Sequence, residues 1–176
     1  MPGRRTSARP FRDTLRKTLQ GRPGGRRGLR MVDVGAKRAT VREAVAEGTI
    51  RMSPATLRAI ERGELPKGDA LAAAETAAVM ATKMTPHLLP LCHPVPLSGV
   101  SVQAVCDPDL PGVRVRASVR GKAPTGFEME ALVAVSTALL TVYDMAKGLE
   151  PGMIIGDIAL RTKSGGKSGK WTRKGA

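Results

Sequence analysis

The chain has 176 residues, and its 29 Lys and Arg against 15 Asp and Glu give a net charge of +14. Hydrophobic residues make up 41% of the sequence, so a chain of this length can bury the core of one domain. Only 2% of the residues are aromatic, which argues against a protein that stacks single-stranded nucleic acid on aromatic rings. Alanine, valine, leucine and methionine must therefore fill the core.

The positive charge is confined to the two ends of the chain. Residues 1–30 hold ten Lys or Arg and one acid, and residues 161–176 hold six Lys or Arg and no acid. Between them, residues 31–160 hold 13 basic and 14 acidic residues. Basic tails bind phosphate, so a non-catalytic RNA- or ribosome-associated protein stays open as an alternative. A neutral centre argues against it, and we expect no specific nucleic-acid partner.

The first thirty residues predict a basic, disordered extension, because they are rich in Arg, Gly and Pro. Their composition also resembles a transit peptide, and Met31 is a candidate for the true start. We expect no secretory leader and no membrane partner, because no uninterrupted apolar run reaches the length of a span. Cys92 and Cys106 form no CxxC pair, which argues against a zinc site and against disulfides and fits a cytoplasmic location.

The predicted elements begin with residues 41–50, whose β-branched residues favour a strand over a helix. Ser53 is a good N-cap and is followed by proline, which predicts a short helix over 54–62. Asp69 is the next good N-cap and predicts an alanine-rich helix over 70–84.

The second half of the chain starts with residues 85–99, where four prolines predict an extended segment without regular structure. Alternating residues then predict a hairpin of strands 99–106 and 112–120. A long helix over 125–147 follows, and a strand with a glycine-rich tail closes the fold within 154–169. This order predicts an α+β domain, an antiparallel sheet with helices packed on one face.

The long helix carries apolar residues at spacings of three and four, and their breadth predicts burial on most sides. Charged residues nevertheless stand near its ends: Glu128 and Glu130 at the start, Asp144 and Lys147 at the close. Burying charge is costly unless the charge is paired or used. Solvated helix ends, stabilised by the helix dipole, explain any one of them equally well.

The spacing of these residues constrains their use. Asp144 and Lys147 are three residues apart and share a helix face. Glu130 lies fourteen residues before Asp144, about 21 Å along a regular helix, so both cannot reach one small reacting centre within one chain. Either they serve different purposes, or two subunits each contribute one end of the helix to a shared site. We favour the second interpretation.

Three further stretches are candidates for a site. His93 stands in a proline-rigid loop, which favours function over a structural role, and Lys67 precedes a helix N-terminus, where anions bind. Lys163 and Lys167 flank glycines that superficially suggest a phosphate loop. Position 161 is not Gly and no helix can follow, so the Walker pattern fails, although the amides and lysines could still hold phosphates.

Six motifs together resemble those of one family, the molybdenum cofactor biosynthesis protein C family of cyclic pyranopterin monophosphate synthases, over about residues 31–170. They are MVDV (31–34), KGD (67–69), LPLCHP (89–94), TGFEMEAL (125–132), YDMAK (143–147) and KSGGKSG (163–169). On this resemblance we expect a synthase domain over 31–170 and a flexible tail over 171–176.

The resemblance implies a ferredoxin-like α+β fold and a homohexamer, a trimer of dimers with active sites at the dimer interface. It implies a lyase reaction in which 3′,8-cyclo-7,8-dihydroguanosine 5′-triphosphate becomes cyclic pyranopterin monophosphate with release of pyrophosphate. It implies no cofactor, and we expect no metal ligands among the site residues; a divalent metal that accompanies the triphosphate stays open.

The resemblance also implies roles for individual residues. Asp144 is the catalytic acid. The lysines for proton transfer and charge stabilisation are Lys67, Lys147 and Lys163. The substrate-contact residues are Leu91, Cys92, His93, Met129 and Glu130, with Glu128, Arg42 and Lys167 of second rank. We expect His93 and lysines to hold the triphosphate, Glu130 to accept hydrogen bonds from the guanine-derived ring, and one lysine with a lowered pKa to act as acid or base.

The chain departs from the family pattern at three positions. Phe127 replaces a small aliphatic residue and Ala146 a frequent cysteine. Glu75 stands where Arg is usual, and this charge reversal could alter packing or affinity if the position meets a neighbouring subunit or the triphosphate. A degenerate synthase that serves as a partner protein is therefore a further alternative, although every proposed catalytic residue is present.

Overall fold

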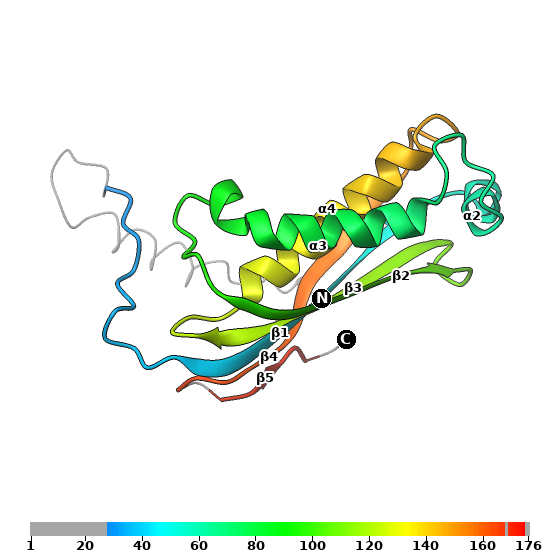
Figure 1. Ribbon diagram of the computed structural model, residues 1–176. Helices are drawn as coiled ribbons and strands as arrows, with labels where there is room; N and C mark the ends of the chain where they lie inside the picture. The colour runs from blue at the N-terminus through cyan, green and yellow to red at the C-terminus, as the bar shows by residue number, and fades with distance from the viewer. Residues whose placement is uncertain (1–27, 168, 175–176) are drawn as a thin grey trace, which may run out of the picture. The chain divides into compact units, whose positions relative to one another are not determined.

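An antiparallel sheet with the strand order β2-β3-β1-β4-β5 organises the fold (Figure 1). The computed structural model describes residues 28–167 and 169–174, so nearly all of the predicted basic extension lies outside the described residues. The strands are β1 (Thr40–Arg51), β2 (Leu97–Asp107), β3 (Gly112–Ala123), β4 (Ile154–Ser164) and β5 (Trp171–Thr172). The helices are α2 (Pro54–Glu61), α3 (Ala70–Leu88) and α4 (Glu128–Ala146).

The predicted α+β fold is confirmed. Without α2 and β5, the order of elements is β-α-β-β-α-β, and the strand order 2-3-1-4 is that of a ferredoxin-like sheet. Figure 1 shows α3 and α4 lying side by side over one face of this sheet. Trp171 and Thr172, which we expected in a flexible tail, pair with Lys163 and Thr162 of β4.

Both predicted helix caps are present. The Ser53 side chain accepts a hydrogen bond from the Thr56 amide at 3.3 Å at the start of α2. Asp69 Oδ1 accepts from the amides of Leu71 and Ala72 at 2.9 and 3.0 Å at the start of α3. Each cap satisfies amides that the first helical turn leaves free.

The predicted end of the second helix is wrong. α3 continues through Pro86 to Leu88, where the prolines predicted irregular structure over 85–99. Proline has no amide to donate to the carbonyl of Thr82, four residues earlier. The hydroxyl of Thr85 donates to that carbonyl instead, at 3.0 Å, so the last turn loses little. A single sequence does not reveal such a replacement.

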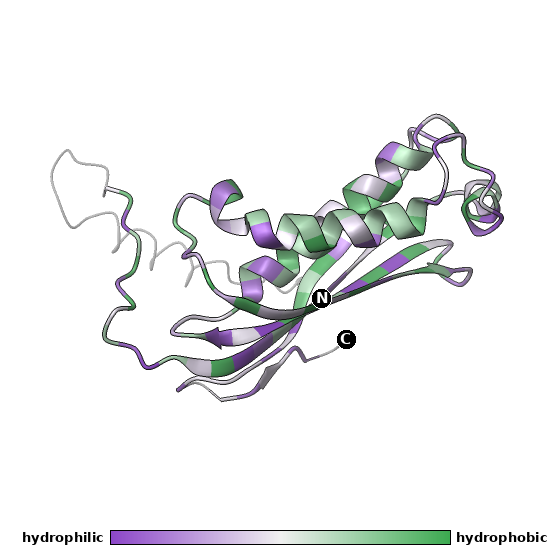
Figure 2. Ribbon diagram, viewed as in Figure 1, coloured by the Kyte–Doolittle hydropathy of each residue, from purple (hydrophilic) through white to green (hydrophobic). Residues whose placement is uncertain are grey.

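The core lies between the sheet and the two long helices, where small residues allow close approach. Ala74 and Ala78 of α3 are fully buried, and α4 crosses β1 at Gly48, where a Cβ would collide with Val135 and Leu139. Figure 2 shows apolar residues concentrated on α3, on α4 and along the sheet beneath them. The prediction that alanine, valine, leucine and methionine fill the core is confirmed, with Ile50, Ile60 and Phe127 as further members.

α4 is less enclosed than predicted. Val135, Ala138 and Leu139 are fully buried against the sheet, but Met129 and Leu140 are 41% and 60% exposed. Among the described residues, α4 is the one helix long and apolar enough to cross a membrane, a test that core helices also pass. Its buried side makes it a core helix, and its open side faces away from this chain's own core.

Candidate functional site

Three charged side chains meet at the C-terminal end of α4, and we call Lys67, Asp144 and Lys147 the Asp144 cluster. Lys67 Nζ donates to Asp144 Oδ2 at 2.6 Å and to the Asp144 backbone carbonyl at 3.0 Å. Lys147, the C-cap of α4, places Nζ 2.7 Å from Asp144 Oδ1. The three side chains line a cavity of about 260 Å³ with Pro66 and Met145. The helix and the loop before α3 therefore converge on one carboxylate.

The charges of this cluster fix its protonation state at neutral pH. Hydrogen bonds from Lys147 and then Lys67 lower the pKa of Asp144 to about 2. The same contact with Asp144 raises the pKa of Lys147, so the prediction of a lysine with a lowered pKa is wrong for Lys147. Asp144, which we expected as the catalytic acid, is an anion here. The protons available at this end are those of the two ammonium groups.

A second group lies at the N-terminal end of α4, and we call Cys92, Glu128, Glu130 and Lys163 the Glu130 cluster. Lys163 Nζ, at the end of β4, lies 2.8 Å from Glu128 Oε1. The Cys92 thiol donates to Glu130 Oε1 at 3.8 Å. A Cβ at Gly126 would collide with the Glu128 carboxylate, so glycine at this position leaves room for the Glu128–Lys163 pair.

Glu130 differs from a solvated helix-end residue, since only 2% of it is exposed. Burial raises the pKa of Glu130, and the neighbouring Glu128 adds to this effect. Burial, together with the Glu130 carboxylate, also raises the pKa of the Cys92 thiol. This end of the helix therefore favours the neutral, protonated forms of its buried groups, and the solvated-end interpretation is wrong for Glu130.

Arg42 fastens the glycine-rich turn beside the Glu130 cluster. Its Nε and Nη2 donate to the carbonyls of Ala123 and Pro124, both at 3.1 Å. The guanidinium lies over Gly166, where a Cβ would collide with it, and Gly165 and Gly166 both have positive φ angles of 90° and 71°. Only glycine adopts this backbone without strain. Two of the donor groups of Arg42 therefore hold the backbone in place and are not free for a ligand.

A basic cavity of about 580 Å³ opens next to this turn. Its charged lining consists of four cations and one carboxylate, which are Lys37, Arg38, Arg42, Lys167 and Glu128. Because Glu128 is paired with Lys163, the cavity carries excess positive charge and suits a polyanion. The family resemblance indicates Arg42 and Lys167 as substrate contacts, but the sequence gives no signal for Lys37 and Arg38, which follow the MVDV motif without a pattern of their own.

The remaining predicted contact residues lie near the N-terminal end of α4. The backbone carbonyl of His93 lies 3.8 Å from the Cys92 sulfur, and the His93 side chain is half-buried. Leu91 and Met129 are 43% and 41% exposed and are open to a ligand or a partner. Among the described residues, no three His, Cys, Asp or Glu side chains lie close enough together to hold a metal ion.

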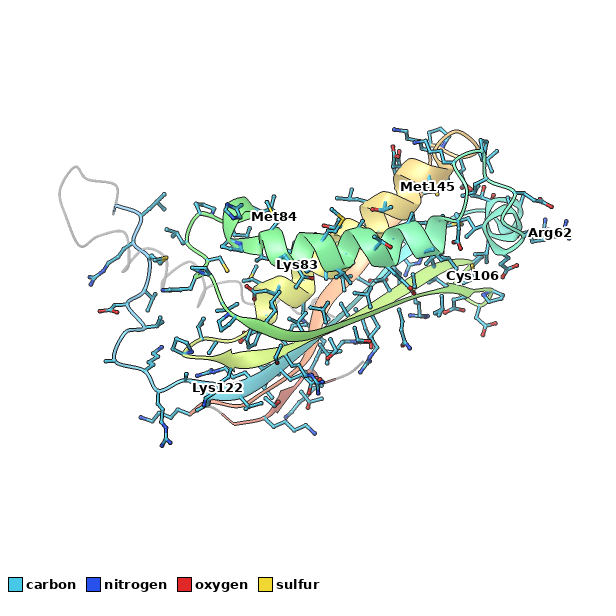
Figure 3. The ribbon with its side chains drawn as sticks, in the orientation of Figure 1. Arg62, Lys83, Met84, Cys106, Lys122 and Met145 are labelled. Carbon is cyan, nitrogen blue, oxygen red and sulfur yellow. The ribbon has the colours of Figure 1, made fainter. Side chains whose placement is uncertain are left out.

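One chain does not bring its two clusters together. α4 is regular from residue 128 to residue 146, so Glu130 and Asp144 are separated by about 21 Å along the helix axis, as predicted. Figure 3 shows Met145, next to Asp144, at the end of the domain that also carries Arg62. Lys163, by contrast, is held at the other end of α4 by its ion pair with Glu128.

The charge reversal at Glu75 has a structural explanation. Glu75 Oε1, on α3, accepts a hydrogen bond from the Ala104 amide at 2.9 Å. Ala104 belongs to β2, which lies at the edge of the sheet. An arginine has no acceptor atom and could not satisfy this amide.

Comparison with known proteins places these residues in a family. Residues 31–166 match the sequence pattern of the MoaC family. The chain is 57% identical over 141 residues to a cyclic pyranopterin monophosphate synthase from Nostoc sp., covering 80% of this chain and 84% of that protein. Proteins of the same name from Trichodesmium erythraeum and Pelotomaculum thermopropionicum are 53% and 51% identical, covering 83% of this chain and 88% and 86% of theirs. The chain therefore belongs to the MoaC family.

Proposed function

We propose that this chain catalyses the reaction of cyclic pyranopterin monophosphate synthases in molybdenum cofactor biosynthesis. The substrate is 3′,8-cyclo-7,8-dihydroguanosine 5′-triphosphate, and the products are cyclic pyranopterin monophosphate and pyrophosphate. The purine ring system opens, a pyranopterin closes, and a hydroxyl displaces pyrophosphate from the α-phosphate. The observation that carries this proposal is the Asp144 cluster, a carboxylate held between two protonated lysines at a cavity.

The Asp144 cluster supplies and receives protons. With its pKa at about 2, Asp144 is anionic; it orients the ammonium groups of Lys67 and Lys147 and raises the pKa of Lys147. A substrate atom entering the cavity meets these N–H donors, and an ammonium can protonate a leaving nitrogen or oxygen. The resulting amine then takes a proton back from the next intermediate. Asp144 serves as the fixed counter-charge through these steps.

The Glu130 cluster recognises the ring. A buried carboxyl group accepts hydrogen bonds from ring N–H groups and thereby recovers the contacts it lost on leaving water. Cys92 and the backbone of His93 border the same position. Accepting two ring N–H groups favours the anionic form of Glu130 and so opposes the effect of burial, which raises its pKa.

The basic cavity beside Gly166 binds the phosphates. Lys37, Arg38, Arg42 and Lys167 offset the charge of a triphosphate, and cations also stabilise the charge that develops on departing pyrophosphate. His93, next to Cys92 of the Glu130 cluster, is a further candidate donor to the phosphates. The cavity adjoins the Glu130 cluster through Glu128, so the ring and the phosphates of one substrate molecule reach both.

We infer that each active site combines the Asp144 cluster of one copy with the Glu130 cluster of another. Met129, Val133, Leu140 and Asp144 recur along one face of α4, at spacings of four, seven and four. The first three are exposed or half-buried and apolar. Two α4 helices packed antiparallel along this face would bury the apolar residues.

The same packing solves the distance problem. A two-fold axis near Thr137, midway between Glu130 and Asp144, sets each copy's Asp144 beside its partner's Glu130 and creates two equivalent sites. α3 lies next to α4 and adds the exposed methionines Met80 and Met84, the second visible in Figure 3. Assembly of three such dimers into a cytoplasmic homohexamer is part of the proposal.

Turnover of the purified full chain tests the proposed function. The cyclised dihydro-GTP substrate is supplied, and pyrophosphate and the pterin product are measured together. Equal amounts of both products support the proposal. A folded oligomer that binds the substrate without forming either product would instead support the degenerate-partner alternative. Binding of arbitrary RNA without turnover would favour the basic-tail alternative.

A further inference from the structure

We propose that Glu150, in the turn between α4 and β4, is a positioning residue that holds Lys67 against Asp144. Nothing in the family motifs points to Glu150, and it lies outside the Asp144 cluster. The proposal rests on the proposed function only for the catalytic consequence. The placement of Lys67 itself is a property of this chain alone.

Glu150 joins two segments that are distant in sequence. Its carboxylate accepts the Ser53 amide with both oxygens, at 3.1 and 2.9 Å. Ser53 is the N-cap of α2, so the carboxylate also lies near the positive end of that helix. Glu150 is half-buried, and the Ser53 amide followed by the Thr56 side chain lowers its pKa, so it is anionic at neutral pH. The N-terminus of α2 is thereby fastened to the turn after α4.

The turn itself is fixed to α4. The Tyr143 hydroxyl donates to the Pro151 carbonyl at 2.9 Å, and the Leu149 amide donates to the Ala146 carbonyl at 2.9 Å. Leu149 also lines the cavity of the Asp144 cluster. Glu150 therefore belongs to a turn that borders the Asp144 cluster and is fixed to the C-terminal end of α4.

α2 in turn carries the loop that presents Lys67. The loop is tied to the end of α2 by the Glu64 amide, which donates to the Ala59 carbonyl at 2.9 Å, and it anchors in the core at Leu65, which is 5% exposed. The Lys67 side chain is 49% exposed and has several rotatable bonds, so its two hydrogen bonds to Asp144 form only while the loop keeps the Lys67 backbone within reach. Leu57 and Ile60 keep α2 in the core, so releasing its N-terminus displaces the loop without freeing it. A small displacement is enough to weaken the contact between Lys67 and the carboxylate.

The experiment compares Glu150→Ala with wild type in the full chain. Glu150→Gln keeps one acceptor for the Ser53 amide, so its Lys67 labelling and its turnover should stay close to those of wild type. Glu64→Ala is the matched control. Glu64 lies in the loop that carries Lys67, and its side chain contacts Arg62 only loosely, at 3.9 Å. Trace acetylation in the absence of substrate, read by mass spectrometry, measures how free the Lys67 amine is.

We expect Glu150→Ala to accelerate acetylation of Lys67 severalfold and to lower kcat roughly 10- to 100-fold with KM little changed, because a small displacement of a catalytic group costs about that much. Unchanged Lys67 labelling overturns the proposal, whether or not the chain is active. Faster labelling with unchanged kcat also overturns it. If the wild-type chain itself shows no turnover but Glu150→Ala still labels faster, the placement of Lys67 is supported and only the proposed function is overturned. If Glu150→Ala unfolds, Glu150→Asp, which keeps the charge but not the reach, gives the same readouts.

Discussion

The two ends of α4 hold carboxylates in opposite environments. Asp144 has a half-exposed side chain and two lysines as partners, which lower its pKa to about 2. Glu130 is buried with a thiol as its hydrogen-bond partner, and its pKa is raised. One helix therefore carries a fixed anion surrounded by ammonium donors at one end and a carboxyl group that tends toward neutrality at the other.

This difference separates the two tasks of the proposed reaction. Proton transfer needs charged donors that exchange with water, and the exposed Asp144 cluster has them. Recognition of a polar ring needs a buried acceptor whose contacts with water are already lost, and Glu130 is one. Because the tasks lie about 21 Å apart on one chain, the comparison also predicts that neither end works without a second copy.

The largest effect is expected when a charged member of either cluster is removed. Lys67→Ala, Asp144→Ala and Lys163→Ala should each lower turnover about a thousandfold or more, since each removes a group proposed to move a proton or neutralise developing charge. Turnover, oligomer size and thermal unfolding are measured together. Glu61→Ala, at the exposed end of α2, is the control. Near-normal turnover in any of the three variants removes that residue from the site.

Mixing two inactive variants tests whether the ends cooperate across subunits. When Asp144→Ala and Glu130→Ala chains are unfolded and refolded together, half of the random dimers are mixed, and each mixed dimer has one of its two sites intact. Turnover should therefore rise from background to roughly a quarter of wild type. Separately refolded variants, mixed afterwards, are the control. No recovery in mixed oligomers shows that both ends act within one chain.

The order of the elements is predictable from the sequence because local patterns determine it. The caps at Ser53 and Asp69, the alternating residues of the hairpin and the period of α4 act over a few residues. The predicted end of α3 at residue 84 is wrong because the hydroxyl of Thr85 replaces the missing amide of Pro86, a contact that depends on the final geometry.

The sequence indicated which side chains gather at the C-terminal end of α4, but not their protonation states. The motifs indicated Asp144, Lys67 and Lys147, and the helix period gave the 21 Å separation. The three-residue spacing allows Asp144 and Lys147 to meet, but it does not give the 2.7 Å contact that raises the pKa of Lys147. Lys37 and Arg38 were missed because only the folded chain brings them to the cavity beside Gly166.

A charge on the open face of α4 should break the association that joins the two ends. Leu140 is apolar and 60% exposed, and Leu140→Lys would place two charges near each other across the proposed two-fold axis. We expect smaller oligomers in analytical ultracentrifugation and turnover at least about tenfold lower at low protein concentration, recovering in part as concentration rises. Val105→Lys, exposed on the opposite face of the sheet, is the comparison variant. An intact oligomer with Leu140→Lys argues against this interface.

The opposite pKa shifts of Glu130 and Asp144 also predict opposite effects of pH on the stability of their variants. The folded pKa of Glu130 is raised, so its contribution to stability is present at low pH and is lost as the pH rises through that value. Glu130→Gln should therefore resist urea better than wild type at pH 8, with the difference shrinking toward pH 4. For Asp144 the folded pKa is lowered, so Asp144→Asn should lose stability at pH 8 and approach wild type below about pH 2. A common trend for both variants would refute the assigned environments.

The smallest effect is expected at Glu75, which belongs to neither end of α4. Glu75→Arg removes the acceptor of the Ala104 amide and should lower the free energy of unfolding by about 1 kcal/mol, the usual contribution of one hydrogen bond. Glu75→Gln keeps an acceptor and should cost less. Because the contact stabilises the edge strand β2 and reaches neither cluster, kcat should stay at the wild-type value in both variants. Urea unfolding and turnover on the same preparations decide the point. A gain in turnover with Glu75→Arg would mean that this face of α3 meets the substrate or a neighbouring subunit, and the two ends of α4 would then not be the whole site.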